Sequence, residues 1–195
     1  MPKLYTGKGD SGSTQLGAAR GSKVNPISAL IGQIDQLHGL LGWLDNHISE
    51  ELPIDQQPKL KLLIKLLIRT AMDHSSKINQ YFHQDPSQAP EGDSDRVVIL
   101  EKWIQHWSDQ IPPLKEFVVM TNMSPAVLTA NDCRILTRDI ERNWIACGGS
   151  PQDPDSSYWN RLSSFFFALS LYLHHCSDCA LTVRSELAQL EWPQP

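Results

Sequence analysis

The sequence predicts an all-α protein, an up-and-down five-helix bundle that follows an extended glycine-rich N-terminal strap. Three observations support this fold class. Apolar residues recur at spacings of three and four over long stretches, as they do on one face of a helix. Proline and glycine divide the chain into segments of helical length. Almost no segment alternates apolar and polar residues with the period of two that marks a strand, so the layers are helix on helix.

The first two helices are predicted from an apolar stripe and from their terminating residues. The first helix begins at Pro26, with Asn25 as its N-cap, and ends before Leu52-Pro53. Its stripe consists of Leu30, Ile34, Leu37, Leu41 and Leu44. The second helix spans residues 55–82 and is followed by a surface loop over residues 84–94, which holds two prolines and a glycine.

The remaining three helices are bounded by proline and glycine in the same way. The third spans residues 95–110 and stops at Pro112-Pro113, before a short apolar connector over residues 117–120. The fourth begins at Pro125 and ends at Cys147, where Gly148-Gly149 can terminate it. The fifth is capped by Ser156 and reaches about residue 175, and one short helix is predicted over residues 181–190.

Size and composition narrow the function. The chain has 195 residues, 41% of them hydrophobic and 20% charged, enough to bury the core of one domain. We divide it into a strap (1–25), a five-helix core (26–176) and a C-terminal tail (177–195). A net charge of −5 argues against nucleic acid as a partner. No apolar run approaches the roughly 20 residues of a membrane span, and the N-terminus lacks a signal-peptide core. We therefore expect a cytoplasmic protein without a membrane partner.

The strap has the composition of a polyphosphate site. Glycines let backbone N–H groups approach phosphate oxygens, hydroxyls donate to them, and Lys or Arg neutralises their charge. The candidate nucleotide-binding residues of the strap are Thr6, Lys8, Gly9, Asp10, Gly12, Thr14, Arg20 and Lys23. The glycines also match the string G-x-G-x-x-G, but the strand before it and the apolar helix after it that a dinucleotide fold needs are missing. A disordered terminus is the structural alternative.

Three further groups of polar residues are candidates for chemistry. Arg134, Arg138, Glu141 and Arg142 lie at spacings that place them along one face of the fourth helix; such a face is also compatible with simple solvation. Asn160, near the start of the fifth helix, can reach a ligand or complete a cap. Asp35 lies beside the apolar stripe of the first helix, where a carboxylate needs a partner such as an arginine.

We expect no metal site. Candidate ligands His174, His175, Cys176 and Cys179 fall within six residues, whereas a closed zinc site usually takes two pairs of ligands from separate segments.

Taken together, these segments resemble the PduO-type ATP:cob(I)alamin adenosyltransferases, over roughly residues 5–173 and in the same order. The strap of the family appears as Tyr5-Thr6-Gly7-Lys8-Gly9-Asp10-Ser11-Gly12-Ser13-Thr14, then Leu16-Gly17 and Arg20-Gly21-Ser22-Lys23. The first-helix motif appears as residues 32–38, the approach to the active-site loop as residues 112–117, the arginine helix as residues 134–142, and the fifth helix as residues 158–163. The sequence is thus identified as a divergent member of this family.

Several positions depart from the family pattern. A Pro-Gly-Gly turn is replaced by residues 120–123, Met-Thr-Asn-Met. The individual replacements are Ile27, Gln36, His38, Asp139 and Ser164.

The resemblance implies a ferritin-like, cobalamin adenosyltransferase-like bundle and a reaction of ATP with a corrinoid. The 5′-deoxyadenosyl group of ATP passes to the cobalt of reduced cob(I)alamin, giving adenosylcobalamin and triphosphate. It implies ATP, Mg2+ and cobalamin as cofactors or substrates, a homotrimer with its active sites between subunits, and a reductase as a possible partner. The implied catalytic residues are Asp35, paired with Arg134, together with Arg138 and Phe117, which would occupy the lower side of cobalt. Glu141, Arg142 and Asn160 would bind the nucleotide with the strap.

Two other functions remain compatible with the sequence. One is a catalytically inactive relative that binds ATP or a corrinoid as a sensor or carrier, since fold alone does not guarantee chemistry. The other is a helical interaction protein with a disordered N-terminus.

Overall fold

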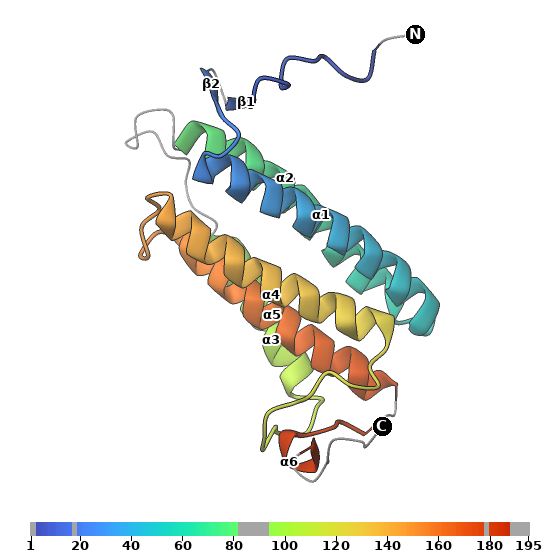
Figure 1. Ribbon diagram of the computed structural model, residues 1–195. Helices are drawn as coiled ribbons and strands as arrows, with labels where there is room; N and C mark the ends of the chain where they lie inside the picture. The colour runs from blue at the N-terminus through green and yellow to red at the C-terminus, as the bar shows by residue number, and fades with distance from the viewer. Residues whose placement is uncertain (1–2, 17–18, 82–93, 178–179, 188–195) are drawn as a thin grey trace, which may run out of the picture.

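The computed structural model of the chain describes residues 3–16, 19–81, 94–177 and 180–187. Five long helices and one short one follow a two-stranded hairpin (Figure 1). The hairpin strands are β1 (Ser13–Leu16) and β2 (Ala19–Ser22), and the helices are α1 (Pro26–Glu51), α2 (Gln57–Tyr81), α3 (Ser94–Ser108), α4 (Pro125–Ala146), α5 (Pro154–Cys176) and α6 (Arg184–Leu187). None of the helices described here is long and apolar enough to cross a membrane.

The five long helices pack in the spatial order α2, α1, α4, α5, α3, with α1 between α2 and α4 and with α5 between α4 and α3. The apolar stripe predicted on α1 is fully buried and gains Ile48 at its end. Large aromatic residues fill the other half of the core, where Trp107 of α3 lies 5.0 Å from Phe165 of α5 between ring centroids. The predicted helical bundle is confirmed.

The helix ends follow the predicted sequence signals, with one correction. The side chain of Asn25 caps α1, and Gly148, at φ 105°, follows the end of α4. The cap of α5 is Asp153, whose carboxylate accepts a hydrogen bond from the backbone N–H of Ser156 at 2.8 Å. The prediction that Ser156 is the cap is therefore wrong: Pro154 is favoured in the first turn, so the helix begins earlier.

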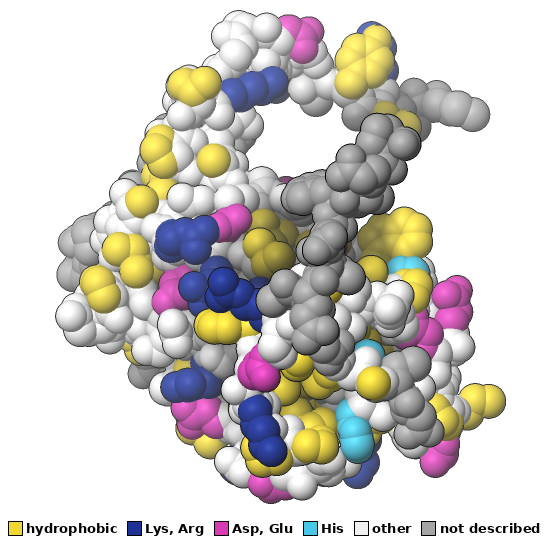
Figure 2. Space-filling view, turned by 60° about the horizontal axis from the view of Figure 1, so that its bottom comes forward, with side chains coloured by type: hydrophobic (Ala, Val, Ile, Leu, Met, Phe, Trp, Pro, Cys, Tyr) yellow, Lys and Arg dark blue, Asp and Glu magenta, His cyan; other side chains and the backbone are white. Residues whose placement is uncertain are grey.

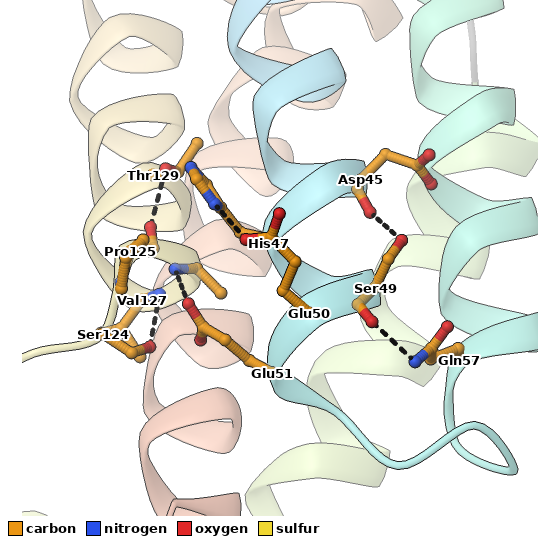
Figure 3. Close-up of polar contacts among 11 residues, drawn as sticks. Asp45, His47, Ser49, Glu50, Glu51, Gln57, Ser124, Pro125, Val127 and Thr129 are labelled. Carbon is orange, nitrogen blue, oxygen red and sulfur yellow. Dashed lines mark hydrogen bonds and ion pairs between the residues drawn. The ribbon is translucent and has the colours of Figure 1, made fainter.

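One long-range contact sets α4 against α1 (Figure 3). The Glu51 carboxylate, at the end of α1, accepts a hydrogen bond from the backbone N–H of Ala126 at 2.9 Å. Ser124 caps the same helix through the N–H of Val127. These N–H groups have no partner inside the helix, so Glu51 and Ser124 together fix where α4 begins.

The strap contains the hairpin β1–β2. The sequence did not predict it, because apolar and polar residues do not visibly alternate there. Ser13 pairs with Ser22 and Thr14 with Gly21 in an antiparallel register. Each strand has only four residues, which is too short for a two-residue period to stand out. The short terminal helix is also shorter than predicted, Arg184–Leu187 instead of residues 181–190, although residues 188–190 lie outside the described part. Gly17, Cys179 and the predicted loop at 84–93 also lie outside it.

Candidate active site

A large cavity lies between the segment before α4, the middle of α4 and α5, and the start of α6. It measures about 990 Å3. Its walls combine apolar and cationic side chains: Leu114, Lys115, Glu116, Phe117, Val118, Met120, Asn131, Arg134, Phe167, Arg184 and Ser185. The mixture suits a large, mostly apolar ligand that carries polar groups at its edge.

Phe117 lines this cavity. The segment that carries it pairs with residues 182–184. Val118 and Val183 form an isolated antiparallel bridge. The backbone N–H of Arg184 donates to the carbonyl of Phe117 at 3.1 Å. The Phe117 side chain is nevertheless 77% exposed. Its backbone is therefore fixed while its ring remains free to contact a ligand.

Arg134 supplies a half-buried cation to the same cavity. Its Nε donates to Oδ1 of Asn131 at 3.0 Å, and its guanidinium carbon lies 5.7 Å from the centroid of the Phe167 ring. Burial, and then the nearby charge of Arg138, lower the pKa of Arg134. Because a guanidinium keeps its proton in proteins, Arg134 presents an incompletely compensated positive charge.

Arg138, Glu141 and Asn160 extend this polar face along α4 and onto α5. Nδ2 of Asn160 donates to Oε1 of Glu141 at 3.0 Å, and Arg138 is exposed one turn from Arg134. Arg142 is not equally available, because its guanidinium forms an ion pair with Asp139. Figure 2 shows Lys and Arg side chains gathered on one face of the molecule beside apolar and acidic ones.

The cations of the strap gather around its glycine turns. Arg20 donates to the carbonyl of Lys8, to the carbonyl of Ser13 at 3.2 Å and to Oγ of Ser13 at 2.6 Å. Nζ of Lys23 is so near Gly9 that a Cβ there would lie 3.1 Å from it. Gly12 has φ 76°, a left-handed conformation that favours glycine. The strap therefore forms a compact cationic loop within the described residues.

Of the remaining strap candidates, Thr6 and Asp10 lie at the turns of the same loop and Thr14 lies in its first strand. The hydroxyl of Thr6 accepts a hydrogen bond from the N–H of Lys8 at 3.3 Å, and the N–H of Asp10 donates to the carbonyl of Gly7 at 3.2 Å. Thr14 lies in β1 and is half-buried.

Within one chain, the strap and the large cavity do not meet. In Figure 1 the hairpin projects beyond the end of the bundle where α1 begins, while the segment before α4 lies near α6 at the opposite end. The residues that the sequence nominated are thus divided between two ends of the protomer.

Asp35 is also separated from the cavity. It is exposed and borders a smaller space of about 180 Å3 between α1 and α2, beside His38 and Met72. Among the described residues there is no ion pair between Asp35 and Arg134; the guanidinium of Arg134 donates to Asn131 instead. The expected pair is not formed inside one chain.

Sequence reasoning missed the contribution of the C-terminal segment. Arg184 and Ser185 line the large cavity because residues 182–184 pair with residues 117–119. No local motif signals such pairing between two irregular segments that are more than sixty residues apart.

His174, His175 and Cys176 of α5 do not form a metal-ligand cluster with other described residues. Across the described ranges, no three His, Cys, Asp or Glu side chains are grouped closely enough to share a metal ion. Cys133 is buried in α4, where burial and then the Asp132 carboxylate raise the pKa of its thiol far above the ordinary value. Such a thiol is a packing residue, not a ligand or nucleophile.

Comparisons with known proteins agree on one family. The sequence model of the family described as "Cobalamin adenosyltransferase" matches residues 4–173. A cobalamin adenosyltransferase of Cupriavidus metallidurans is 28% identical over 184 residues, 89% of this chain and 89% of that protein. The corrinoid adenosyltransferase MMAB of Mus musculus is 25% identical over 177 residues, 88% of this chain and 73% of that protein.

Solved structures agree on the fold. A variant PduO-type ATP:corrinoid adenosyltransferase from Lactobacillus reuteri, in complex with cobalamin and ATP, superposes with a TM-score of 0.80 at 20% identity. The superposition covers 93% of this chain and 96% of that one. With a family model that spans most of its length, the chain belongs to the cobalamin adenosyltransferase family.

Proposed function

We propose that the cavity beside Phe117 and the arginine face of α4 form the site at which this corrinoid adenosyltransferase works. The enzyme transfers the 5′-deoxyadenosyl group of ATP to the cobalt of cob(I)alamin. Co(I) donates an electron pair to the ribose C5′, a Co–C bond forms, the C5′–O bond breaks, and triphosphate leaves with the electron pair of that bond. The protein must hold the two substrates in line and stabilise the leaving charge.

The observation that carries this assignment is the position of two arginines on one helix. Arg134 lines the apolar cavity, and Arg138 follows after four residues, about 6 Å along the helix axis. An apolar ring system in the cavity therefore lies about one turn from a cation that can receive triphosphate. Asn160, held by Glu141 at 3.0 Å, would orient the nucleotide on the same side.

Phe117 would act on the corrin, not on the nucleotide. An apolar ring placed against the lower side of cobalt gives no ligand to the metal, so it favours four-coordinate cobalt and the reduced state. The 77% exposure of the ring is in keeping with this role, because a ligand would cover it.

We further propose that the active site is completed between subunits of a homotrimer. The strap and the cavity lie at opposite ends of one chain, and Asp35 and Arg134 have no ion pair with each other within it. In a trimer, the strap of one subunit would cover ATP on the arginine face of its neighbour. Asp35 of that subunit would pair with Arg134 across the interface.

In the strap, Lys8, Arg20 and Lys23 would neutralise the triphosphate, and the N–H groups around Gly9, Asp10 and Gly12 would donate to it. The hydroxyls of Thr6 and Thr14 would add donors. We place Mg2+ on the phosphates, where it keeps water and phosphate oxygens as ligands. A separate reductase would supply Co(I). Since Asp139 engages Arg142, Arg142 would contribute less than Arg138.

The test is an anaerobic assay that mixes the protein, MgATP and chemically reduced cob(I)alamin and follows the absorbance change to adenosylcobalamin. Product that depends on the protein and on ATP is expected. ATP binding without product would instead identify a sensor or carrier built on the same bundle. Cross-linking or sedimentation at the assay concentration tests the trimer independently.

A further inference from the structure

A second cavity adjoins the large one on the other side of the segment before α4. It measures about 420 Å3, within the usual range for ligand sites of about 300–1,000 Å3. Leu114, Lys115 and Glu116 line both cavities. The rest of the wall is mainly apolar: Ile111, Pro112, Pro113, Leu171, His174, His175, Leu181 and Val183. The two spaces are therefore neighbours with a shared wall.

One wall residue of this second cavity is a buried histidine with unused hydrogen-bonding capacity. His174 lies in the last turn of α5 and is 2% exposed. Its Nε2 is buried and has no hydrogen-bond partner among the described residues. Buried polar groups are seldom left without a partner, because such a group loses its hydration and gains no hydrogen bond in return. His174 lines the cavity, so a small rotation of its imidazole would let a ligand there supply the missing partner.

We propose that this cavity binds the heterocyclic base of the corrinoid's nucleotide tail after the base has left cobalt. This inference rests on the proposed function of the large cavity. If Phe117 occupies the lower side of cobalt, the base that coordinates there must move elsewhere. Moving it from the large cavity to its neighbour keeps a flat aromatic ring out of water, between the prolines and leucines that line this second space.

The hydrogen-bonding groups of the second cavity match those of the base. A benzimidazole that leaves cobalt exposes one ring nitrogen with a free lone pair. When Nε2 of His174 carries a proton, it donates to that nitrogen, and the buried Nε2 then has a hydrogen-bond partner. Lys115 lines both cavities, and we assign it to the phosphodiester that joins the base to the corrin ring.

A third cavity, of about 440 Å3, lies on the α3 side and shares Leu114 with both. Its described wall contains no buried polar atom without a partner. Lys115 does not line it either. The cavity at His174 therefore offers the better hydrogen-bonding and charged groups for the base and its phosphodiester.

The experiment compares two corrinoids that differ in this tail. Cob(II)alamin carries the base and the phosphodiester, whereas cob(II)inamide lacks both. Each is titrated anaerobically, with MgATP present, into the wild-type protein and the variants H174L and L181W, and binding is followed by absorbance. H106L is the control, because His106 is an exposed residue of α3 that lines neither cavity.

We expect the wild-type protein to bind cob(II)alamin about tenfold more tightly than cob(II)inamide. H174L removes the hydrogen-bond donor. L181W places a larger side chain in the cavity, at a wall residue that is only partly buried. Each variant should remove most of that preference while leaving cob(II)inamide affinity unchanged, and H106L should keep it.

Two results would overturn the proposal. One is equal wild-type affinity for both corrinoids. The other is that L181W keeps the wild-type preference for cob(II)alamin. If H174L fails to fold, the L181W result decides the question alone. Adenosylation of cobinamide by the wild-type protein would uphold the proposed function in either case, so the two failures are distinguishable.

Discussion

Nδ2 of Asn160, in the second turn of α5, donates a hydrogen bond to Oε1 of Glu141 on α4 at 3.0 Å. This contact ties the helix that carries Arg134 and Arg138 to the start of α5. The pair therefore joins two candidate site residues that are 19 positions apart in the sequence.

Asn160→Ala is expected to raise the KM for ATP and to lower kcat/KM by at least about tenfold, because it removes a nucleotide contact and frees Glu141. Steady-state kinetics with varied ATP would measure this. Asn143→Ala is the matched control, since Asn143 also bridges two helices, donating to Gln33 of α1 at 2.8 Å. Equal kinetic losses in the two variants would show that Asn160 has only a structural role.

Arg138→Ala is expected to lower kcat by about 100-fold or more, because a cation that faces the leaving triphosphate acts mainly in the transition state. Arg138→Lys should restore part of the loss. Arg161→Ala removes the same charge from a surface pair with Glu101 and should retain most of the activity. Single-turnover rates at saturating ATP separate chemistry from binding; an unchanged rate in Arg138→Ala would remove this residue from the mechanism.

Phe117→Ala is expected to leave the melting temperature nearly unchanged while lowering adenosylcobalamin formation by about tenfold or more. The ring is 77% exposed, so its truncation removes little buried area. Ile54→Ala, at another exposed apolar residue far along the chain, controls for loss of surface area. The absorbance of bound cob(II)alamin should shift away from the four-coordinate form only in Phe117→Ala, and the same spectrum in both variants would contradict the role.

The sequence was sufficient for the bundle because its signals are local. The stripe from Leu30 to Leu44 and the cap at Asn25 are read from neighbouring residues, and both occur as expected. The cap of α5 was misplaced by three residues because Asp153 and Ser156 are both good caps, and only the geometry of the turn chooses between them. The hairpin was missed because each strand has only four residues.

The site was less predictable because its parts depend on pairing at a distance. Arg134 and Phe117 were nominated individually, and the structure brings both to one cavity. Arg184 was not nominated, since it reaches that cavity only through the backbone contact with Phe117. The spacing of the α4 charges suggested four available residues, but Asp139 engages Arg142 in an ion pair. Residue spacing gives the face of a helix and not the partner of each charge.

The Glu51 contact predicts a stability effect that is separate from catalysis. Glu51→Ala leaves the N–H of Ala126, at the start of α4, without its partner, which is expected to cost about 1–2 kcal/mol. For a chain of this length, each kcal/mol corresponds to a fall in melting temperature of about 2–4 °C.

The matched control for this change is Glu50→Ala. Glu50 is the adjacent carboxylate, and its side chain is 73% exposed. Among the described residues it contacts His47, with 3.6 Å between Oε2 of Glu50 and Nδ1 of His47. Such an i,i+3 pair on a helix surface contributes about 0.2–0.5 kcal/mol, so Glu50→Ala should melt within about 2 °C of the wild-type protein. Thermal unfolding at equal protein concentration would compare the three proteins. If Glu50→Ala lowered the melting temperature as much as Glu51→Ala, loss of negative charge at the end of α1 would explain both effects, and the hydrogen bond to α4 would not be the cause.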